Sequence, residues 1–226
     1  MKPSRLIIKP TSDGSTTIYD TILDEHYHSI HGAVQESQHV FIKNGLAEII
    51  ARSKPNKTIN ILEVGFGTGL NCLLSHTYLK DKKYNVIYTG IEPNRVSNHL
   101  LEKLNYYNNK SDKNIFTKLH LTEWGAEEII NTHFHLIKHS CNIQLFNTVT
   151  KYDLVYFDAF GPRVEKELWK VTVFKKIHEL MNYNGILVTY CAKGQVRRDL
   201  IDTGFKVERL EGPPGKREML RAIKSY

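Results

Sequence analysis

The chain has 226 residues, a length that suits one domain with a full hydrophobic core. Hydrophobic residues make up 41% and charged residues 24% of it, which is ordinary for a globular protein. No apolar run approaches the roughly 20 residues that span a bilayer, and residues 1–10 lack a signal-peptide apolar region. We therefore expect a cytoplasmic protein without membrane contact. The three cysteines are isolated, which argues against a disulfide framework and against a thiolate zinc site.

The net charge of +7 is unevenly distributed along the chain. Residues 191–226 hold nine lysines and arginines against five acidic residues. A basic end of this kind attracts polyanions such as RNA, although a solvated basic face without a partner has the same composition.

Residues 1–45 have the pattern of a small N-terminal appendage, and residues 46–226 that of one larger domain. Short apolar runs at 7–9 and 16–19 flank Asp13-Gly14, which predicts a hairpin. A helix is expected over 35–52. The appendage is expected to pack on the domain that follows.

From residue 59 onward, apolar runs of strand length alternate with helical patterns. This alternation predicts an α/β fold with a mostly parallel sheet that has helices on both faces. A final antiparallel pair on such a sheet resembles the class I S-adenosylmethionine (SAM) methyltransferases, which have a Rossmann-like, seven-stranded sheet. The expected strands are 59–64, 85–91, 116–121, 152–157, 185–191, 205–210 and 219–224, with an extra hairpin at 134–137 and 143–146 and a helix over 166–181.

A glycine-rich turn follows the first of these strands and precedes a helix that begins at Leu70. Glycines let the backbone approach a ligand closely, and the start of a helix presents free N–H groups to it. The spacing matches neither the dinucleotide fingerprint nor the phosphate-loop motif. The turn consists of Gly65, Phe66, Gly67, Thr68 and Gly69.

Two acidic residues accompany this turn. Glu63 lies two residues before it, and the resulting E-x-G-x-G-x-G pattern resembles motif I of SAM methyltransferases, in which the acid interacts with the methionine end of the cofactor. Glu92 ends the second strand, where an acid accepts ribose hydroxyls; a surface acid is the alternative. Trp124, placed after the expected third strand, is a candidate for stacking on adenine or, equally, for packing in the core.

Asp158 stands at the carboxyl end of a central strand, beside the expected cofactor crevice. Methyl transfer to an amine needs a neutral nitrogen lone pair that is aligned with the methyl group. A carboxylate there orients the amine and accepts a proton, which makes Asp158 the candidate catalytic residue. A strand-end cap is the alternative.

Three segments in this order resemble one specific family. They are Glu63 to Asn71, Asp158 to Pro162 with Glu167-Leu168-Trp169, and Gly215 to Leu220. Together they look like the tRNA 5-methylaminomethyl-2-thiouridine methyltransferases (the MnmD type, equivalent to the methyltransferase domain of bifunctional MnmC). The resemblance covers nearly the whole chain from about residue 17, including the segment Gly32–Phe41.

The resemblance implies transfer of a methyl group from SAM to the amine of 5-aminomethyl-(2-thio)uridine at the tRNA wobble position. It implies the tRNA anticodon loop as partner, leaves protein partners unknown, and leads us to expect neither a metal nor FAD, because the chain ends before a flavin oxidase domain. The cofactor-binding candidates are Glu63, Gly65, Phe66, Gly67, Thr68, Gly69, Asn71, Glu92 and Trp124. The substrate-binding candidates are Glu36, Phe160, Gly161, Pro162, Tyr190, Lys193, Arg197, Arg198, Lys216 and Arg217.

Two other functions fit parts of the sequence. A transferase acting on a small amine or polyamine would keep the cofactor residues and change the substrate. A non-catalytic RNA-binding protein on a degenerate methyltransferase scaffold is the other, and the intact glycine turn with Asp158 argues against it. Histidines cluster near residues 26–31 and 133–139, but no acid–histidine metal motif accompanies them.

Overall fold

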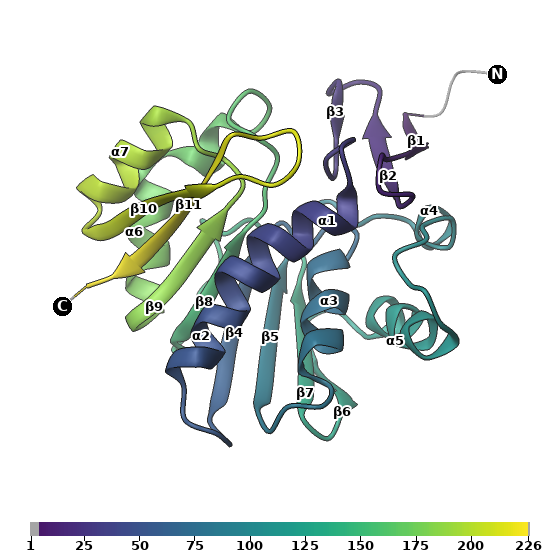
Figure 1. Cartoon of the computed structure of the whole chain (residues 1–226), viewed down its shortest axis with the longest axis horizontal. Coiled ribbons are helices and arrows are strands. Elements are labelled where there is room, and N and C mark those ends of the chain that lie inside the picture. Colours follow the sequence, from purple (N-terminus) through teal and green to yellow (C-terminus); the bar gives the residue numbers. More distant parts are fainter. Residues whose placement is uncertain (1–4, 226) are drawn as a thin grey trace.

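A computed structural model describes residues 5–225 of the chain. An eight-stranded sheet forms its centre, in the order β10-β11-β9-β8-β4-β5-β7-β6 (Figure 1). The strands β9, β8, β4, β5 and β7 pair in parallel, whereas β6, β11 and β10 join their neighbours antiparallel. The bounds are β4 (Thr58–Val64), β5 (Asn85–Ile91), β6 (Glu127–Asn131), β7 (Phe134–His139), β8 (Tyr152–Phe157), β9 (Met181–Thr189), β10 (Phe205–Glu211) and β11 (Glu218–Lys224).

The central strands are apolar on both faces because helices cover both faces of the sheet. Alternate residues of β4 belong to different cores: Ile61 packs in one apolar cluster, and Leu62 in the other. The first cluster includes side chains of η1, α3 and α5, and the second includes those of α6 and α7. The helices on the first side are η1 (Gln38–Leu46), α3 (Leu70–Leu79) and α5 (Lys110–Leu121), and those on the second are α6 (Val171–Leu180) and α7 (Gly194–Asp202).

One long helical run crosses the first face of the sheet. It comprises α1 (Ala33–Ser37), the wider π-helical turns of η1, and α2 (Ala47–Arg52), and it agrees with the helix expected over 35–52 (Figure 1). Gly45 lets the run approach β9 and β8, since a Cβ atom there would lie 3.0 Å from Val188 Cγ2. The run continues through residue 45, and the division of the chain into an appendage and a domain stays a prediction.

A small three-stranded antiparallel sheet precedes the helical run. Its strands are β1 (Leu6–Pro10), β2 (Thr16–Asp20) and β3 (Glu25–His26). The β1–β2 hairpin turns at Asp13-Gly14, where the sequence predicted it, and Asp13 accepts hydrogen bonds that close the turn. This sheet lies above one end of the central sheet (Figure 1), so the chain returns from it directly over the carboxyl ends of the parallel strands.

The expected strand 116–121 is wrong, because these residues end helix α5. Phe116 and Leu119 are buried three positions apart, which is helical spacing, and the Asn109 side chain caps the helix by accepting the Asp112 N–H. The third parallel strand is β7, and it pairs with β5.

The expected hairpin partner 143–146 is also wrong. Ile143 and Phe146 are buried, but this segment forms a turn with a backbone hydrogen bond between Phe146 and Asn142. The antiparallel partner of β7 is β6, which precedes it. The sheet therefore has eight strands rather than the expected seven, while its mostly parallel order and terminal antiparallel pair agree with the predicted fold class. Two short elements complete the fold, α4 (Asn98–Leu101) and the 3-10 helix η2 (Lys166–Trp169).

Candidate functional site

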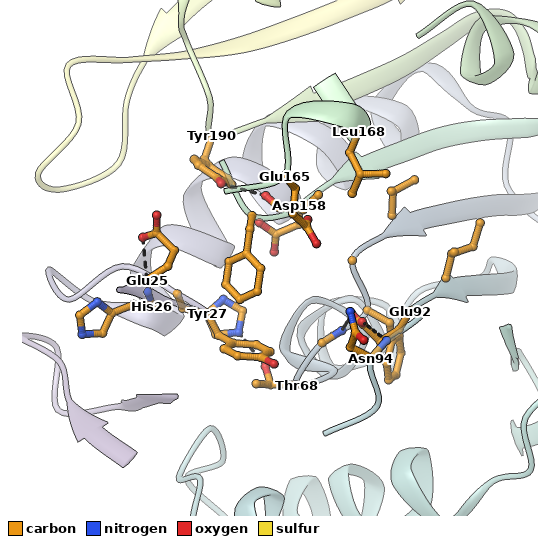
Figure 2. A pocket seen from close by; sticks show the side chains of 18 of the residues that line it. Glu25, His26, Tyr27, Thr68, Glu92, Asn94, Asp158, Glu165, Leu168 and Tyr190 are labelled. Atoms are coloured by element: carbon orange, nitrogen blue, oxygen red, sulfur yellow. Dashed lines mark hydrogen bonds between the residues drawn. The ribbon is translucent and has the colours of Figure 1, made fainter. Parts of the chain in front are cut away.

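A cavity of about 320 Å³ opens at the carboxyl ends of β4, β5 and β8. Ligands bind at this edge of parallel sheets, where strand ends leave a crevice between loops. Three loops form its floor: 64–68 after β4, 91–94 after β5, and 158–160 after β8. Residues 25–30 of the N-terminal segment form the opposite wall, so the cavity lies between this segment and the sheet (Figure 2).

The glycine turn lies against the loop after β8. Gly65 has φ +93°, and a Cβ atom there would lie 2.7 Å from the backbone oxygen of Asp158. Only glycine tolerates both this left-handed conformation and so close a contact. The tight turn therefore brings the predicted cofactor loop and the predicted catalytic residue to one place.

Glu92 holds the glycine turn from the side of β5. Its carboxylate accepts the N–H of Gly67 at 3.0 Å and the N–H of Asn94 at 2.8 Å. Burial raises the pKa of Glu92 to about 7, although these two hydrogen bonds oppose the shift. Figure 2 shows Glu92 and Asn94 together at one end of the cavity.

Asn71 connects the two acids that the sequence singled out. It lies in the first turn of α3, and its Nδ2 group donates to Glu63 Oε1 at 2.8 Å and to Asp158 Oδ2 at 2.7 Å. Glu63 is 1% exposed, also accepts a hydrogen bond from Tyr88, and does not line the cavity. Its carboxylate therefore acts on the cavity through Asn71.

Asp158 lines the cavity floor with part of its carboxyl group open to the cavity and protein on its other sides. Burial raises the pKa of this carboxyl well above its usual range, and the negative charge of Glu36 adds to the rise. The hydrogen bond from Asn71 and the charge of Lys216 act in the opposite direction. Asp158 is thus a carboxyl group that holds a proton far more readily than an exposed aspartate.

Glu36 and Lys216 form an ion pair in the cavity wall, from α1 and from the loop between β10 and β11. Glu36 also accepts the N–H of Ser29. The Lys216 ammonium lies over the Tyr190 ring, 3.9 Å from its centroid, and the Tyr190 hydroxyl donates to the backbone oxygen of Ala159 at 2.8 Å. These contacts fix three predicted substrate residues beside Asp158.

Aromatic side chains of the N-terminal segment close the cavity. Tyr27 packs edge-on against Phe160, with 4.9 Å between the two ring centroids. Burial raises the pKa of the Tyr27 hydroxyl to about 12. His28 Nε2 forms a hydrogen bond with the Thr68 hydroxyl at 2.6 Å. Burial lowers the pKa of His28 to about 4, so its ring is neutral at pH 7. The segment is therefore fixed to the glycine turn and to the loop after β8.

The cavity brings together many of the predicted site residues and leaves others outside its lining. Of the cofactor candidates, Gly65, Phe66, Gly67, Thr68 and Glu92 line it, whereas Glu63, Gly69, Asn71 and Trp124 do not. Of the substrate candidates, Glu36, Phe160, Tyr190 and Lys216 line it, whereas Gly161, Pro162, Lys193, Arg197, Arg198 and Arg217 do not. The roles of all these residues stay predictions.

Trp124 packs instead against Phe66 and beneath two cations. The Lys138 ammonium nitrogen lies 5.0 Å and the Arg95 guanidinium carbon 4.6 Å from a ring centroid of Trp124. The Lys138 ammonium also donates to the carbonyl of Leu119 at the end of α5. Trp124 follows α5 rather than a strand of the sheet, so the basis for placing adenine there is absent. The residues that follow the true third strand β7 and line the cavity are Asn142 and Ile143.

Several lining residues were missed by sequence reasoning. Among the described residues, the cavity is lined by five carboxylates and one lysine, and of these acids Glu25 and Glu165 were not anticipated. Glu165 comes soon after the Asp158 motif in the sequence, and this proximity could have identified it as a residue of the cavity. Glu25, Tyr27 and His28 carried none, because only the folded N-terminal segment places them over the glycine turn.

Within residues 5–225, no helix is long and apolar enough to cross a membrane. The same residues contain no group of three or more histidine, cysteine, aspartate or glutamate side chains arranged to hold a metal ion.

Comparisons with known proteins point in one direction. A family model described as S-adenosyl-L-methionine-dependent methyltransferase matches residues 107–225. The tRNA 5-methylaminomethyl-2-thiouridine biosynthesis bifunctional protein MnmC of Burkholderia multivorans (strain ATCC 17616 / 249) is 27% identical over 221 residues, which covers 90% of this chain and 33% of that protein. MnmC of Burkholderia thailandensis is 28% identical over 245 residues, covering 96% of this chain and 34% of that protein. The chain thus spans about a third of the length of the curated relatives that it matches.

Among solved structures, MNMC2 from Aquifex aeolicus superposes with a TM-score of 0.81 at 26% sequence identity. The match covers 100% of this chain and 72% of the Aquifex chain. Together with the family model, this similarity confirms the predicted α/β fold of the class I methyltransferases.

Proposed function

The chain belongs to the S-adenosyl-L-methionine-dependent methyltransferase family, and we propose that it methylates the primary amine of 5-aminomethyl-(2-thio)uridine at the wobble position of tRNA. The observation that carries this proposal is the position of Asp158. It is a half-buried carboxyl group with a raised pKa, on the floor of a cavity that the glycine turn also lines. The similarity to the MnmC proteins supports the choice of substrate.

The residues present fit SAM. The glycine turn lines the cavity, and Glu92 stands at the end of β5, where an acid meets the ribose hydroxyls of a nucleoside. Asn142 and Ile143, which follow the third parallel strand, are the best placed residues for the adenine, and we propose them in place of Trp124. When bound, SAM supplies an electrophilic methyl group on a sulfonium.

The acidic lining suits two cationic reactants. Glu25, Glu36, Glu92, Asp158 and Glu165 outnumber the one lysine among the described lining residues. A sulfonium and an alkylammonium both carry positive charge, and carboxylates that burial has made reluctant to ionise gain most from a cation beside them. The cavity therefore favours a cationic cofactor with an amine substrate over an anionic pair.

Asp158 would act on the proton of the substrate amine. An alkylammonium is not a nucleophile, because its lone pair holds a proton. Burial brings the pKa of Asp158 closer to that of an amine, so the carboxylate accepts that proton at a smaller free-energy cost than an exposed aspartate would. The same carboxyl group then orients the neutral nitrogen by hydrogen bonding, while Asn71 keeps it in place.

The partner that we propose is the anticodon loop of tRNA. The wobble base has to leave the loop to reach Asp158, and enzymes that modify bases in this way hold the base in a pocket. Lys193, Arg198 and Arg217 are exposed, and we propose that they contact phosphates around the pocket.

The test uses the purified chain, radiolabelled SAM and two kinds of acceptor: tRNA that carries 5-aminomethyl-2-thiouridine, and a set of small amines and polyamines. Label in the tRNA, recovered as 5-methylaminomethyl-2-thiouridine by nucleoside mass spectrometry, is the expected result. Label in the small amines alone would replace the substrate and keep the chemistry. SAM binding without label in any acceptor would favour a non-catalytic RNA-binding protein.

A further inference from the structure

The ion pair between Glu36 and Lys216 has no evident structural purpose where it lies. Glu36 is 5% exposed, and Lys216 reaches it from a loop 180 residues further along the chain. Taking two charges out of water offsets most of the attraction between them, so an ion pair in a cavity wall adds little stability. The two groups instead present a fixed donor beside a fixed acceptor to whatever occupies the cavity.

Both groups keep capacity for a ligand. Lys216 has three N–H donors, of which one points to Glu36, while its contact with the Tyr190 ring restrains the side chain. One Glu36 oxygen binds Lys216, and the other accepts the Ser29 N–H, which leaves lone pairs on both. The Tyr190 hydroxyl is bound to Ala159, so the platform under Lys216 is fixed to the loop of Asp158.

A uracil ring has the complementary pattern on its edge. Its O4 accepts a hydrogen bond, and the adjacent N3–H donates one; cytosine has the reverse, an amino donor at C4 and an acceptor at N3. The aminomethyl group is attached to C5, next to C4. When the amine lies at Asp158 and the C4 side of the ring faces Glu36 and Lys216, the ring presents to them the group on C4 and, next to it, the group at position 3.

We infer that Lys216 and Glu36 read the Watson–Crick edge of the acceptor base, with Lys216 donating to O4 and Glu36 accepting from N3–H. This inference rests on the proposed function and makes the pair the determinant that selects uracil over cytosine. A cytosine in the same position would turn its amino group to the Lys216 ammonium and its N3 lone pair to the Glu36 carboxylate. Both contacts are repulsive, and such mismatches give specificity.

The placement of the pair supports this reading. Glu36, Lys216 and Asp158 all line the same cavity, and the Tyr190 ring under Lys216 is hydrogen-bonded to Ala159, the residue after Asp158. The two contacts are to O4 and to N3–H, so the pair does not contact the atom on C2. The pair therefore reads uracil with oxygen or with sulfur at that position.

The experiment compares two anticodon stem-loop RNAs, one with 5-aminomethyluridine and one with 5-aminomethylcytidine at the wobble position. The readout is the ratio of their kcat/KM values. Wild-type protein is expected to prefer the uridine RNA by roughly 5- to 150-fold, the range expected for one such pair of base contacts. Any effect of a variant on Asp158 changes both rates alike and cancels in this ratio.

Two variants test the pair, and two matched variants serve as controls. Glu36→Gln replaces the acceptor by an amide that can rotate to donate to cytosine N3, and Lys216→Met removes the donor. Both are expected to lower the ratio by about tenfold. Glu48→Gln and Lys57→Met alter ion pairs outside the cavity, with Arg52 and with Asp153, and should leave the ratio at the wild-type value.

The outcomes separate this inference from the proposed function. Methylation of the uridine RNA with an unchanged ratio in both Glu36→Gln and Lys216→Met, when calorimetry shows that each still binds SAM, overturns the inference and keeps the proposed function. An equal rate on both RNAs by the wild-type protein does the same. No methylation of the uridine RNA by the wild-type protein overturns both.

Discussion

Replacing Asn71 by leucine tests whether this side chain positions Asp158. Leucine has the same branched arrangement of side-chain heavy atoms as asparagine but offers no donor. Both hydrogen bonds from Nδ2, to Glu63 at 2.8 Å and to Asp158 at 2.7 Å, are therefore lost. A hydrogen bond to a charged group contributes about 1.5–3 kcal/mol. If the bond to Asp158 contributes this free energy in the transition state and not in the bound ground state, kcat should fall by roughly 10- to 150-fold.

The pH dependence gives a second signature. The hydrogen bond from Asn71 lowers the pKa of Asp158 against the effect of burial. Without it the pKa of Asp158 rises further, and the pH below which activity declines should move upward. A variant that merely loosens the fold would lower activity without moving this limb of the profile.

The assay measures kcat, KM and the pH profile for methyl transfer, with the SAM dissociation constant from calorimetry. Ser75→Ala is the matched control, because Ser75 lies one turn further along α3 and makes its hydrogen bond to Tyr156 outside the cavity. An unchanged kcat and pH profile in Asn71→Leu would refute the positioning role. A large loss of SAM affinity with an unchanged kcat would instead make Asn71 a cofactor ligand, as its place after the glycine turn first indicated.

Three further changes have expected outcomes. Asp158→Asn should keep SAM affinity and lower kcat by about 10²- to 10⁴-fold, as measured by single-turnover methyl transfer; near-normal turnover would remove Asp158 from the chemistry. Gly65→Ala should abolish SAM binding in calorimetry, because its Cβ atom would lie 2.7 Å from the Asp158 backbone oxygen at a φ of +93°. Glu92 has a pKa of about 7 in the folded chain and a usual value of 4.5, so its protonated form stabilises the fold at low pH, and this contribution is lost as the pH rises through 7. Glu92→Gln should therefore reduce the loss of unfolding free energy between pH 5 and 8, by at most about 3 kcal/mol, and thermal denaturation should show a smaller decline in Tm over that range. An identical decline in Tm in the two proteins would contradict the assignment.

Two of the correctly predicted central strands are buried along most of their length. Ile59–Val64 and Tyr152–Phe157 are mostly apolar because helices cover both sides of the sheet there, and this composition is visible in the sequence. The glycine turn and Asp158 follow these strands, so their meeting in one cavity also followed from the pattern.

The errors have local causes. The run Phe116–Leu121 contains enough apolar residues for a strand, and only the spacing of Phe116 and Leu119, with the cap at Asn109, identifies the helix. Misplacing the third strand moved the expected adenine contact to Trp124 and away from Ile143, the cavity residue that we propose for it. The N-terminal wall was beyond the sequence, because Tyr27 reaches Phe160 through a tertiary contact that no local pattern encodes.

The cavity wall that Glu36 and Lys216 form joins two parts of the chain that are synthesised at different times. Glu36 meets Lys216, and His31 packs so closely on Gly215 that a Cβ atom there would lie 2.1 Å from its ring. On the ribosome, the glycine turn and Glu92 are made long before Lys216 emerges. A nascent chain therefore contains the glycine turn and Glu92 before Lys216 is made, and the last strands to be synthesised complete the wall that we propose for the acceptor base.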